Sequence, residues 1–179
     1  MSLSFNKLNK LMAETVENEL TELLSSFKCS AEPSAEHFLQ RVAVGHEKAG
    51  ISRTYIALDT DDTGFISVKG FFTIAIKCLS VNGQHSIPSG MIEQMNVNKD
   101  IAQAYLLGQL AKADGVEKGF GKEMIGIAMD FFSKGKEMFG CSVVRLDCKD
   151  RMIDYYESLG FFFMKKNMDN TLNQMIAII

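Results

Sequence analysis

Apolar residues recur along the chain at two spacings, and the spacing separates the expected helices from the expected strands. Between residues 8 and 27 they lie three or four positions apart, which predicts one long helix, or two helices with a break, over about 6–26. Residues 1–26 are therefore expected to form an N-terminal helical part. A second helix is expected between Pro33 and Gly50, because proline suits the first turn of a helix and glycine its C-terminal cap.

Short apolar runs bounded by polar turns predict strands in much of the remaining chain. Residues 53–59 and 65–79 flank a polar turn, which is the pattern of a hairpin. Residues 101–111 are apolar on both faces, as expected of a central strand that is covered on both sides. Further strands are expected over 142–148, 161–164 and 173–179, the last of them returning to the edge of the sheet.

Two more helices and one long loop complete the expected elements. Apolar residues keep helical spacing from about 119 to 138, and a short helix is expected over 150–159, closed by Gly160. Residues 80–98 are polar and contain several turn signals. Long loops in compact domains are commonly functional, so we interpret this segment as a mobile loop near a site.

Composition narrows the class of protein. The 179 residues, 46% of them hydrophobic and 23% charged, are typical of a single soluble domain over residues 1–179. The formal net charge of −3 argues against broad, non-specific binding of nucleic acid, which depends on neutralising phosphates. No apolar run reaches the length that a membrane-spanning helix needs, so no membrane partner is expected.

The residues that commonly bind metals do not form a metal-binding pattern. The four cysteines form no CxxC pair, which indicates reduced thiols in a cytoplasmic protein rather than a disulfide or metal framework: Cys29, Cys78, Cys141 and Cys148. A calcium-loop spacing begins at Asp59, but Gly70 stands where the loop needs a bidentate carboxylate. We expect no metal.

One stretch carries the features of an anion site, residues 115–122 between the central strand and the helix that follows it. The first N–H groups of a helix have no intrahelical partner and lie at the positive end of its dipole. Gly119 and Gly121 lack a Cβ and permit a close approach to the backbone, while Lys118 and Lys122 add positive charge. This order of strand, glycine turn and helix predicts that the turn binds a phosphate group.

A second motif joins this turn to a known family. Tyr156 begins the segment Tyr-Glu-Ser-Leu-Gly-Phe, which ends at Phe161 and follows another strand and a short helix. The two motifs, in this order, resemble the GCN5-related N-acetyltransferase (GNAT) superfamily over about residues 27–164. Residues 106–111 and 53–55 look similar to a bacterial branch that includes toxin-like acetyltransferases. The resemblance implies an α/β (α+β) fold, with a mixed central β-sheet flanked by helices.

The resemblance also implies acetyl-CoA as the co-substrate and a place for it on this chain. The central strand would pair with the pantetheine arm, and the turn would hold the pyrophosphate. The implied cofactor-binding residues are Leu110, Ala111, Lys112, Glu117, Lys118, Gly119, Phe120, Gly121 and Lys122. Val116 departs from the family pattern, which has glutamine or arginine there, so backbone N–H groups must supply most of the binding.

The implied reaction is direct transfer of the acetyl group from the thioester to a neutral primary amine. Tyr156, where the family commonly has its tyrosine, is the candidate general acid for the leaving thiolate. No general base is identified, and Glu93, Asp100, Asp147 and His85 are candidates by position alone. Cys148 is interpreted as a buried thiol rather than a nucleophile.

Several alternatives stay open at this level. The acceptor is a small-molecule amine, a peptide amine or, in a toxin-like enzyme, aminoacyl-tRNA; nucleic-acid binding and a homodimer are both undecided. A protein that binds coenzyme A but has lost catalysis is the competing class, which the departure at Val116 keeps open. A P-loop nucleotide site is excluded, because Lys122 is followed by Glu123 and not by serine or threonine.

Overall fold

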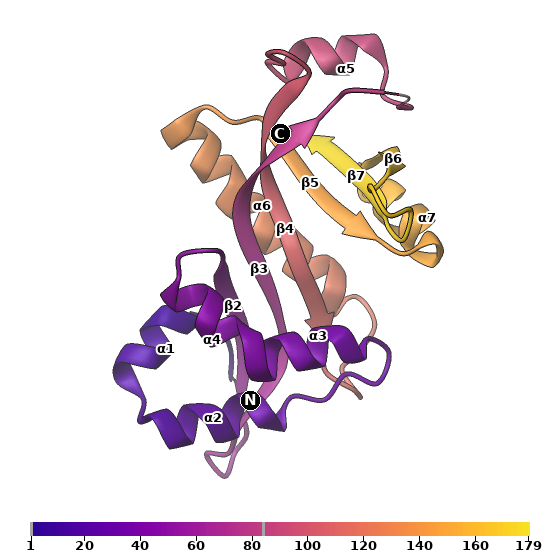
Figure 1. Ribbon diagram of the computed structural model, residues 1–179. Helices are drawn as coiled ribbons and strands as arrows, with labels where there is room; N and C mark the ends of the chain where they lie inside the picture. Colours follow the sequence, from indigo (N-terminus) through magenta and orange to yellow (C-terminus); the bar gives the residue numbers. More distant parts are fainter. Residues whose placement is uncertain (1, 84) are drawn as a thin grey trace. The chain divides into compact units, whose positions relative to one another are not determined.

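The computed structural model describes residues 2–83 and 85–179 (Figure 1). The chain forms two compact units, one from Met1–Ala75 with Gln109–Ala128 and the other from Ile76–Gly108 with Met129–Ile179. The single domain expected over residues 1–179 therefore stays a prediction, and each unit is described by itself.

The first unit begins with a strand that the sequence analysis missed. β1 (Ser2–Lys7) precedes α1 (Leu8–Glu14) and α2 (Glu17–Ser26). The N-terminal helical part therefore has the predicted break, but its helices begin at Leu8 and not at the start of the chain. The helical pattern begins only at Leu8. Before it, residues 2–7 pair antiparallel with residues 55–60, and Phe5 packs its ring against Phe72 and Phe120; these distant contacts keep the short segment extended.

The second predicted helix is continuous but irregular. It consists of α3 (Pro33–His37), a π-helical turn η1 (Phe38–Val42) and α4 (Ala43–Lys48). Pro33 occupies the first turn and Gly50 follows the C-terminus with φ +68°, as expected of a helix start and a glycine cap.

The apolar faces of these helices pack on a hairpin. β2 (Arg53–Thr60) and β3 (Ile66–Ser80) are antiparallel, which confirms the predicted hairpin. Leu8, Leu24 and Leu39 are buried against a strand face that contains Ile56 and Phe71. Across the hairpin, Ala57 pairs with Gly70 and Leu58 with Val68, so Lys69 is an extra, bulged residue on β3.

β4 (Ile101–Lys112) and α6 (Phe120–Phe139) take the predicted positions, and each runs from one unit into the other. Gly70 shows how tightly these elements pack in the first unit. A Cβ at this position would lie 2.9 Å from the Ala111 carbonyl oxygen and 2.9 Å from Met124 Sδ. The glycine is therefore required for the close approach of β3 to β4 and α6.

The second unit contains the C-terminal strands, whose order differs from the prediction. β5 (Val143–Cys148) pairs antiparallel with β7 (Asn173–Ile178), and β7 pairs antiparallel with β6 (Phe162–Lys166). β7 thus lies between β5 and β6, and the expectation that the last strand forms the edge is wrong. Four of its residues from Gln174 to Ala177 are buried, which fits an internal position.

The segment predicted as a long irregular loop, residues 80–98, includes the short helix α5 (Ser89–Gln94). Ser86 N–H donates to the Met164 carbonyl of β6 at 2.9 Å, and Lys165 Nζ donates to the Asn82 carbonyl at 2.7 Å. The start of the segment is thus attached to β6, and its mobility stays a prediction.

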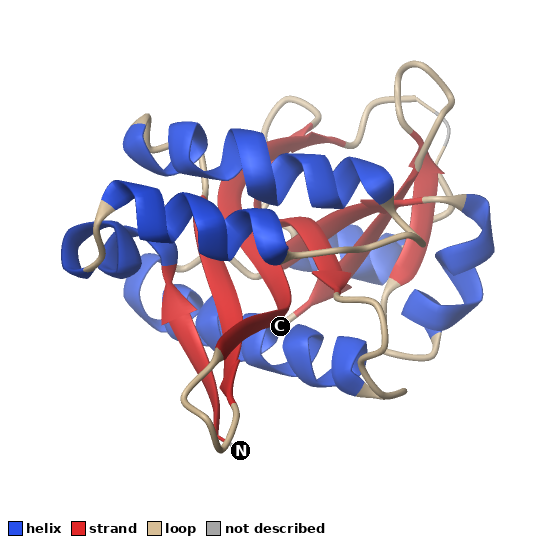
Figure 2. Ribbon diagram, turned by 90° about the horizontal axis from the view of Figure 1, so that it is seen from below, coloured by secondary structure: helices blue, strands red, loops and turns tan. Residues whose placement is uncertain are grey.

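The strands form one mixed sheet in the order β1-β2-β3-β4-β5-β7-β6, with a parallel ladder between β4 and β5. Helices flank the strands (Figure 2), as the sequence analysis expected of the fold class. Among the described residues, no helix combines the length and the apolarity that crossing a membrane would require.

Candidate active site

The connection between β4 and α6 is anchored to the rest of the first unit at its beginning. Ala113 N–H donates to the carbonyl of the bulged Lys69, and Asp114 N–H donates to the Lys28 carbonyl, both at 2.8 Å. The Asp114 carboxylate accepts hydrogen bonds from Ser30 Oγ at 2.6 Å and from Ser30 N–H at 3.0 Å. These bonds from Ser30 hold the pKa of the Asp114 carboxyl below its usual value.

Lys112, the last residue of β4, supports the following turn through its side chain. Its Nζ donates to the carbonyl of Val116 and, at 3.1 Å, to the carbonyl of Glu117. One ammonium group therefore satisfies two loop carbonyls. The sequence analysis placed Lys112 among the cofactor-binding residues, but its contacts in the structure are with the loop itself.

The backbone N–H groups after this turn are available to a ligand. In the described parts of the chain, no acceptor is found for the N–H groups of residues 117–121. The first helical bonds run from Lys122 and Glu123 N–H to the Gly119 carbonyl, at 2.9 and 3.1 Å. Gly119 has φ +98°, a conformation that glycine adopts readily.

The charged side chains of the loop are exposed. Lys118 and Lys122 lie at the start of α6, and among the described residues neither has an ion-pair or hydrogen-bond partner on its side chain. Glu117 is also exposed. Phe120 is buried and stacks with Phe5, so only its backbone can contribute to an anion site.

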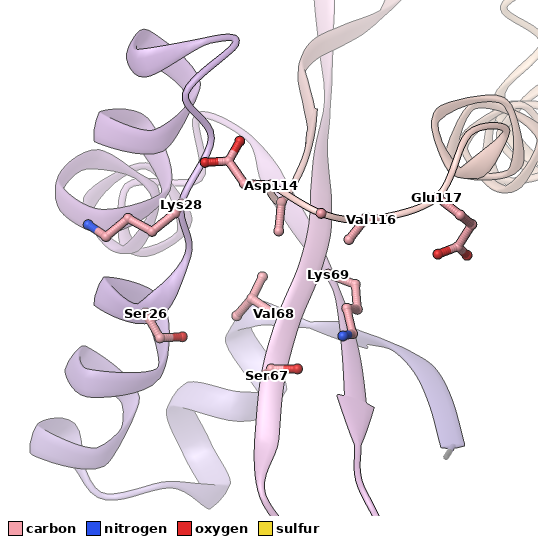
Figure 3. A pocket seen from close by; sticks show the side chains of 10 residues that line it. Ser26, Lys28, Ser67, Val68, Lys69, Asp114, Val116 and Glu117 are labelled. Carbon is pink, nitrogen blue, oxygen red and sulfur yellow. The ribbon is translucent and has the colours of Figure 1, made fainter.

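A pocket of about 310 Å³ lies on one side of the loop (Figure 3). The loop runs past it from Asp114 through Val116 to Glu117, opposite Ser67 and Val68 of β3. The two lysines that line it already have acidic partners: Lys28 lies 3.1 Å from Glu36, and Lys69 lies 3.5 Å from Asp59. The unpaired positive charge is at Lys118 and Lys122, outside this pocket's lining.

The strand before the loop ends its pairing with β5 early. The parallel ladder runs from Tyr105–Val144 to Leu107–Leu146, and the last part of β4 lies beyond it. Leu110 is half-buried and Ala111 is buried, so the Ala111 side chain belongs to the core. A cofactor could meet the backbone of these residues rather than their side chains.

The second motif, Tyr156 to Phe161, lies in the second unit. η2 (Asp150–Met152) continues into α7 (Ile153–Glu157), which carries Tyr156, and Gly160 follows with φ +87°. The Tyr156 ring lies 5.3 Å from the Tyr155 ring and 5.8 Å from the Phe161 ring, both edge-on. Both tyrosines are half-buried.

The surroundings of Tyr156 affect its ionisation. Burial raises the pKa of Tyr156, and the neighbouring Cys148 and Tyr155 raise it further. Burial also raises the pKa of Cys148, to about 11, so this thiol stays protonated at neutral pH. The structure thus supports the interpretation of Cys148 as a buried thiol.

Sequence reasoning missed polar groups whose partners are set by the fold. Ser30 and Asp114 bond to each other across the first unit. Glu47 is 5% exposed, pairs with Arg53 at 3.0 Å and accepts the Thr54 N–H at 2.9 Å. No local pattern marked these residues, because Ser30 and Asp114 lie 84 residues apart and Glu47 meets Arg53 and Thr54 only when α4 packs beside β2.

The candidate general bases gain no support. The Asp147 carboxylate forms two hydrogen bonds with the Arg145 guanidinium, at 3.0 and 2.9 Å, and is therefore already engaged. Glu93 lies on α5 and His85 on the segment before it. The assignment of a base stays open.

Comparison with solved structures finds the same fold in KacT and AtaT, which agrees with the fold that the sequence resemblance implied. A tyrosine-to-phenylalanine mutant of KacT superposes with a TM-score of 0.74 at 15% identity, over 97% of this chain and 94% of that one. AtaT complexed with acetyl-methionyl-tRNAfMet superposes with a TM-score of 0.74 at 20% identity, over 96% of this chain and 94% of that one.

A third structure, AtaTR bound with AcCoA, has a TM-score of 0.70 at 19% identity and covers 98% of this chain and 93% of that one. No protein-family profile matches the sequence, and a search of curated proteins finds no match. At these identities the likeness establishes the fold, and the chemistry has to be argued from the residues of this chain.

Proposed function

We propose that this chain is an acetyl-CoA-dependent N-acetyltransferase that transfers an acetyl group directly to a primary amine. The observation that carries the proposal is the loop before α6. Its N–H groups at residues 117–121 have no acceptor among the described residues, and two unpaired lysines stand beside them. Such a row of N–H groups at a helix start suits the pyrophosphate of coenzyme A.

The departure at Val116 is compatible with this role. A glutamine or arginine at this position would add a side-chain donor, but valine leaves the backbone donors unchanged. Lys112 holds the Val116 and Glu117 carbonyls on the loop, while the N–H groups of residues 117–121 have no acceptor among the described residues. We infer that acetyl-CoA is bound mainly by the backbone of residues 117–121, with Lys118 and Lys122 supplying charge.

In the proposed reaction, the amine nitrogen forms a bond to the acetyl carbon, and the carbon–sulfur bond of the thioester breaks. The proton of the attacking amine leaves to solvent, and the departing sulfur takes up a proton. Tyr156 is proposed as the donor of that proton. Its raised pKa keeps the hydroxyl protonated at neutral pH, so it can donate a hydrogen bond as charge develops on sulfur.

The first test compares the wild-type protein with the Tyr156→Phe variant. With acetyl-CoA and a panel of amines, the wild type is expected to release free coenzyme A, measured with a thiol reagent. The variant should lose activity roughly 100-fold, because it retains the ring but not the donated proton. Its affinity for acetyl-CoA, measured by calorimetry, is expected to stay unchanged.

Two outcomes would decide against this assignment. If both proteins bind acetyl-CoA but neither acetylates any acceptor, the chain is a coenzyme A-binding protein without catalysis. If both turn over equally, Tyr156 is not the acid.

Because Tyr156 retains its proton, the wild-type rate is also expected not to fall between pH 7 and 9.

Aminoacyl-tRNA is the second candidate acceptor. It is supported by the likeness to AtaT, whose structure contains acetyl-methionyl-tRNAfMet, and opposed by the net charge of −3. Charged tRNAs and free amines of the same aminoacyl groups would be offered side by side. Acetylation of charged tRNA alone would favour the toxin-like reaction, whereas acetylation of free amines alone would exclude it.

Other assignments remain predictions of the sequence: a bacterial, cytoplasmic protein, and a homodimer. Size-exclusion chromatography with light scattering would test the homodimer directly.

A further inference from the structure

A buried amide side chain lies at the start of the last strand of the second unit. Asn173, the first residue of β7, is 1% exposed. In the sheet it pairs with Cys148, the last residue of β5, and with Lys166, the last residue of β6. It therefore lies where three strands end together.

Asn173 makes two hydrogen bonds at this junction. Its Nδ2 donates to the Cys148 carbonyl at 3.2 Å and to Asp150 Oδ1 at 2.8 Å. The same carboxylate pairs with Lys166 Nζ, and this pair together with the bond from Asn173 lowers the pKa of Asp150. The end of β5 and the residue that begins η2 are thus held by one amide.

This junction determines where α7 begins. Asp150 is the first residue of η2, which continues directly into α7. A helix as short as α7, Ile153–Glu157, is not stable by itself and takes its position from the contacts at its ends. Asp150 is therefore one of the contacts from which α7, which carries Tyr156, takes its position.

We propose that Asn173 is a positioning residue for Tyr156, acting through Asp150 and the Cys148 carbonyl. The proposal rests on the role of Tyr156 in the proposed function. Asn173 itself needs no contact with substrate. Its amide fixes the backbone from which the tyrosine hydroxyl is presented, and small displacements of a reacting group lower rates strongly.

The activity test removes the amide in two backgrounds. Asn173→Ala is expected to lower kcat roughly 10-fold to 100-fold, with the KM for acetyl-CoA nearly unchanged. In the Tyr156→Phe background the same substitution should cause no further loss, because the group that it positions is already gone. A purely structural role would lower kcat equally in both backgrounds and would overturn the proposal.

A matched control separates positioning from loss of stability. Asn167 holds the turn between β6 and β7 by accepting the Thr171 and Leu172 N–H groups at 2.9 and 3.1 Å. Asn167→Ala weakens the same hairpin away from Asp150 and should leave kcat unchanged. If Asn173→Ala does not fold, Asp150→Ala is used, which removes the acceptor of the Asn173 amide and is expected to cause the same loss of kcat.

A second measurement does not depend on activity. In protein labelled with 3-fluorotyrosine, the Tyr156 resonance is identified by its absence from the Tyr156→Phe variant. Asn173→Ala is expected to shift this resonance, whereas Asn167→Ala leaves it in place. An unshifted resonance would refute the positioning role even in an active enzyme, while absence of transfer by the wild type would refute the proposed function alone.

Discussion

Lys112 shows how a single side chain can shape the candidate cofactor loop by bonding to the loop's own carbonyl groups. It donates to the Val116 and Glu117 carbonyls, while Lys118 is exposed and has no partner among the described residues. Two lysines of the same loop are thus expected to contribute to binding in different ways.

We predict that Lys112→Met lowers the affinity for acetyl-CoA about 10-fold, because two loop carbonyls lose their donor. Lys118→Met, the matched control, should lower affinity through lost attraction to phosphate. Calorimetry at several salt concentrations distinguishes them: the Lys118 variant loses salt dependence and the Lys112 variant keeps it. An equal loss of salt dependence in both variants would place Lys112 on the phosphate instead.

At the scale of elements, the position of α6 depends on the absence of a side chain on β3. A Cβ at Gly70 would meet the Ala111 carbonyl and Met124 Sδ, both at 2.9 Å, and Phe120 Cε1 at 3.0 Å. Phe120 begins the helix whose N–H groups form the candidate anion site. Packing at Gly70 is thereby connected to the geometry of that site.

Gly70→Ala is predicted to destabilise the protein by about 1–3 kcal/mol, the usual range for overpacking, and to weaken acetyl-CoA binding. Gly126→Ala is the control, since Gly126 lies within α6 with no atom within 4 Å of an added Cβ. It should stabilise the protein by up to about 1 kcal/mol, because alanine favours helix. Urea unfolding of both variants shows whether each substitution lowers or raises the free energy of unfolding. A stabilising Gly70→Ala would contradict the packing argument.

At the scale of the whole molecule, the free energy of unfolding is expected to fall in alkali. Burial, with the charges of Asp147 and Asp150, raises the pKa of Cys148 from 9.0 to about 11. The folded chain then keeps this proton at a pH where the unfolded chain loses it. The stabilisation is complete below pH 9 and is lost as pH rises towards 11, by on the order of 2 kcal/mol.

Cys148→Ala should remove this part of the pH dependence. The free energy of unfolding of wild type and variant, measured in urea at pH 8 and pH 10, is expected to converge as pH rises. Tyr55, Tyr105, Tyr155 and Tyr156, whose pKa values burial also raises, contribute mainly above pH 10. A constant difference between wild type and variant at both pH values would rule out the thiol as the source.

The order of helices and strands could largely be predicted from the chain itself. Spacing of apolar residues identified the hairpin 53–79, the central strand and α6, because burial of one face or of both imposes a period that is visible locally. The glycine turn at 115–122 was visible for a similar reason, since a tight turn into a helix needs particular residues at fixed positions. β1 was missed because its six residues are too few for a clear period.

Only the tertiary structure decided which strands pair with each other and which polar side chains bond. It placed β7 between β5 and β6, paired Asp114 with Ser30, and brought Asn173 to the start of η2. Strand order and polar pairing depend on contacts between residues far apart in sequence, and no local pattern encodes them. The sequence therefore determined the elements and the type of loop, whereas the fold decided which side chains shape the loop and position the tyrosine.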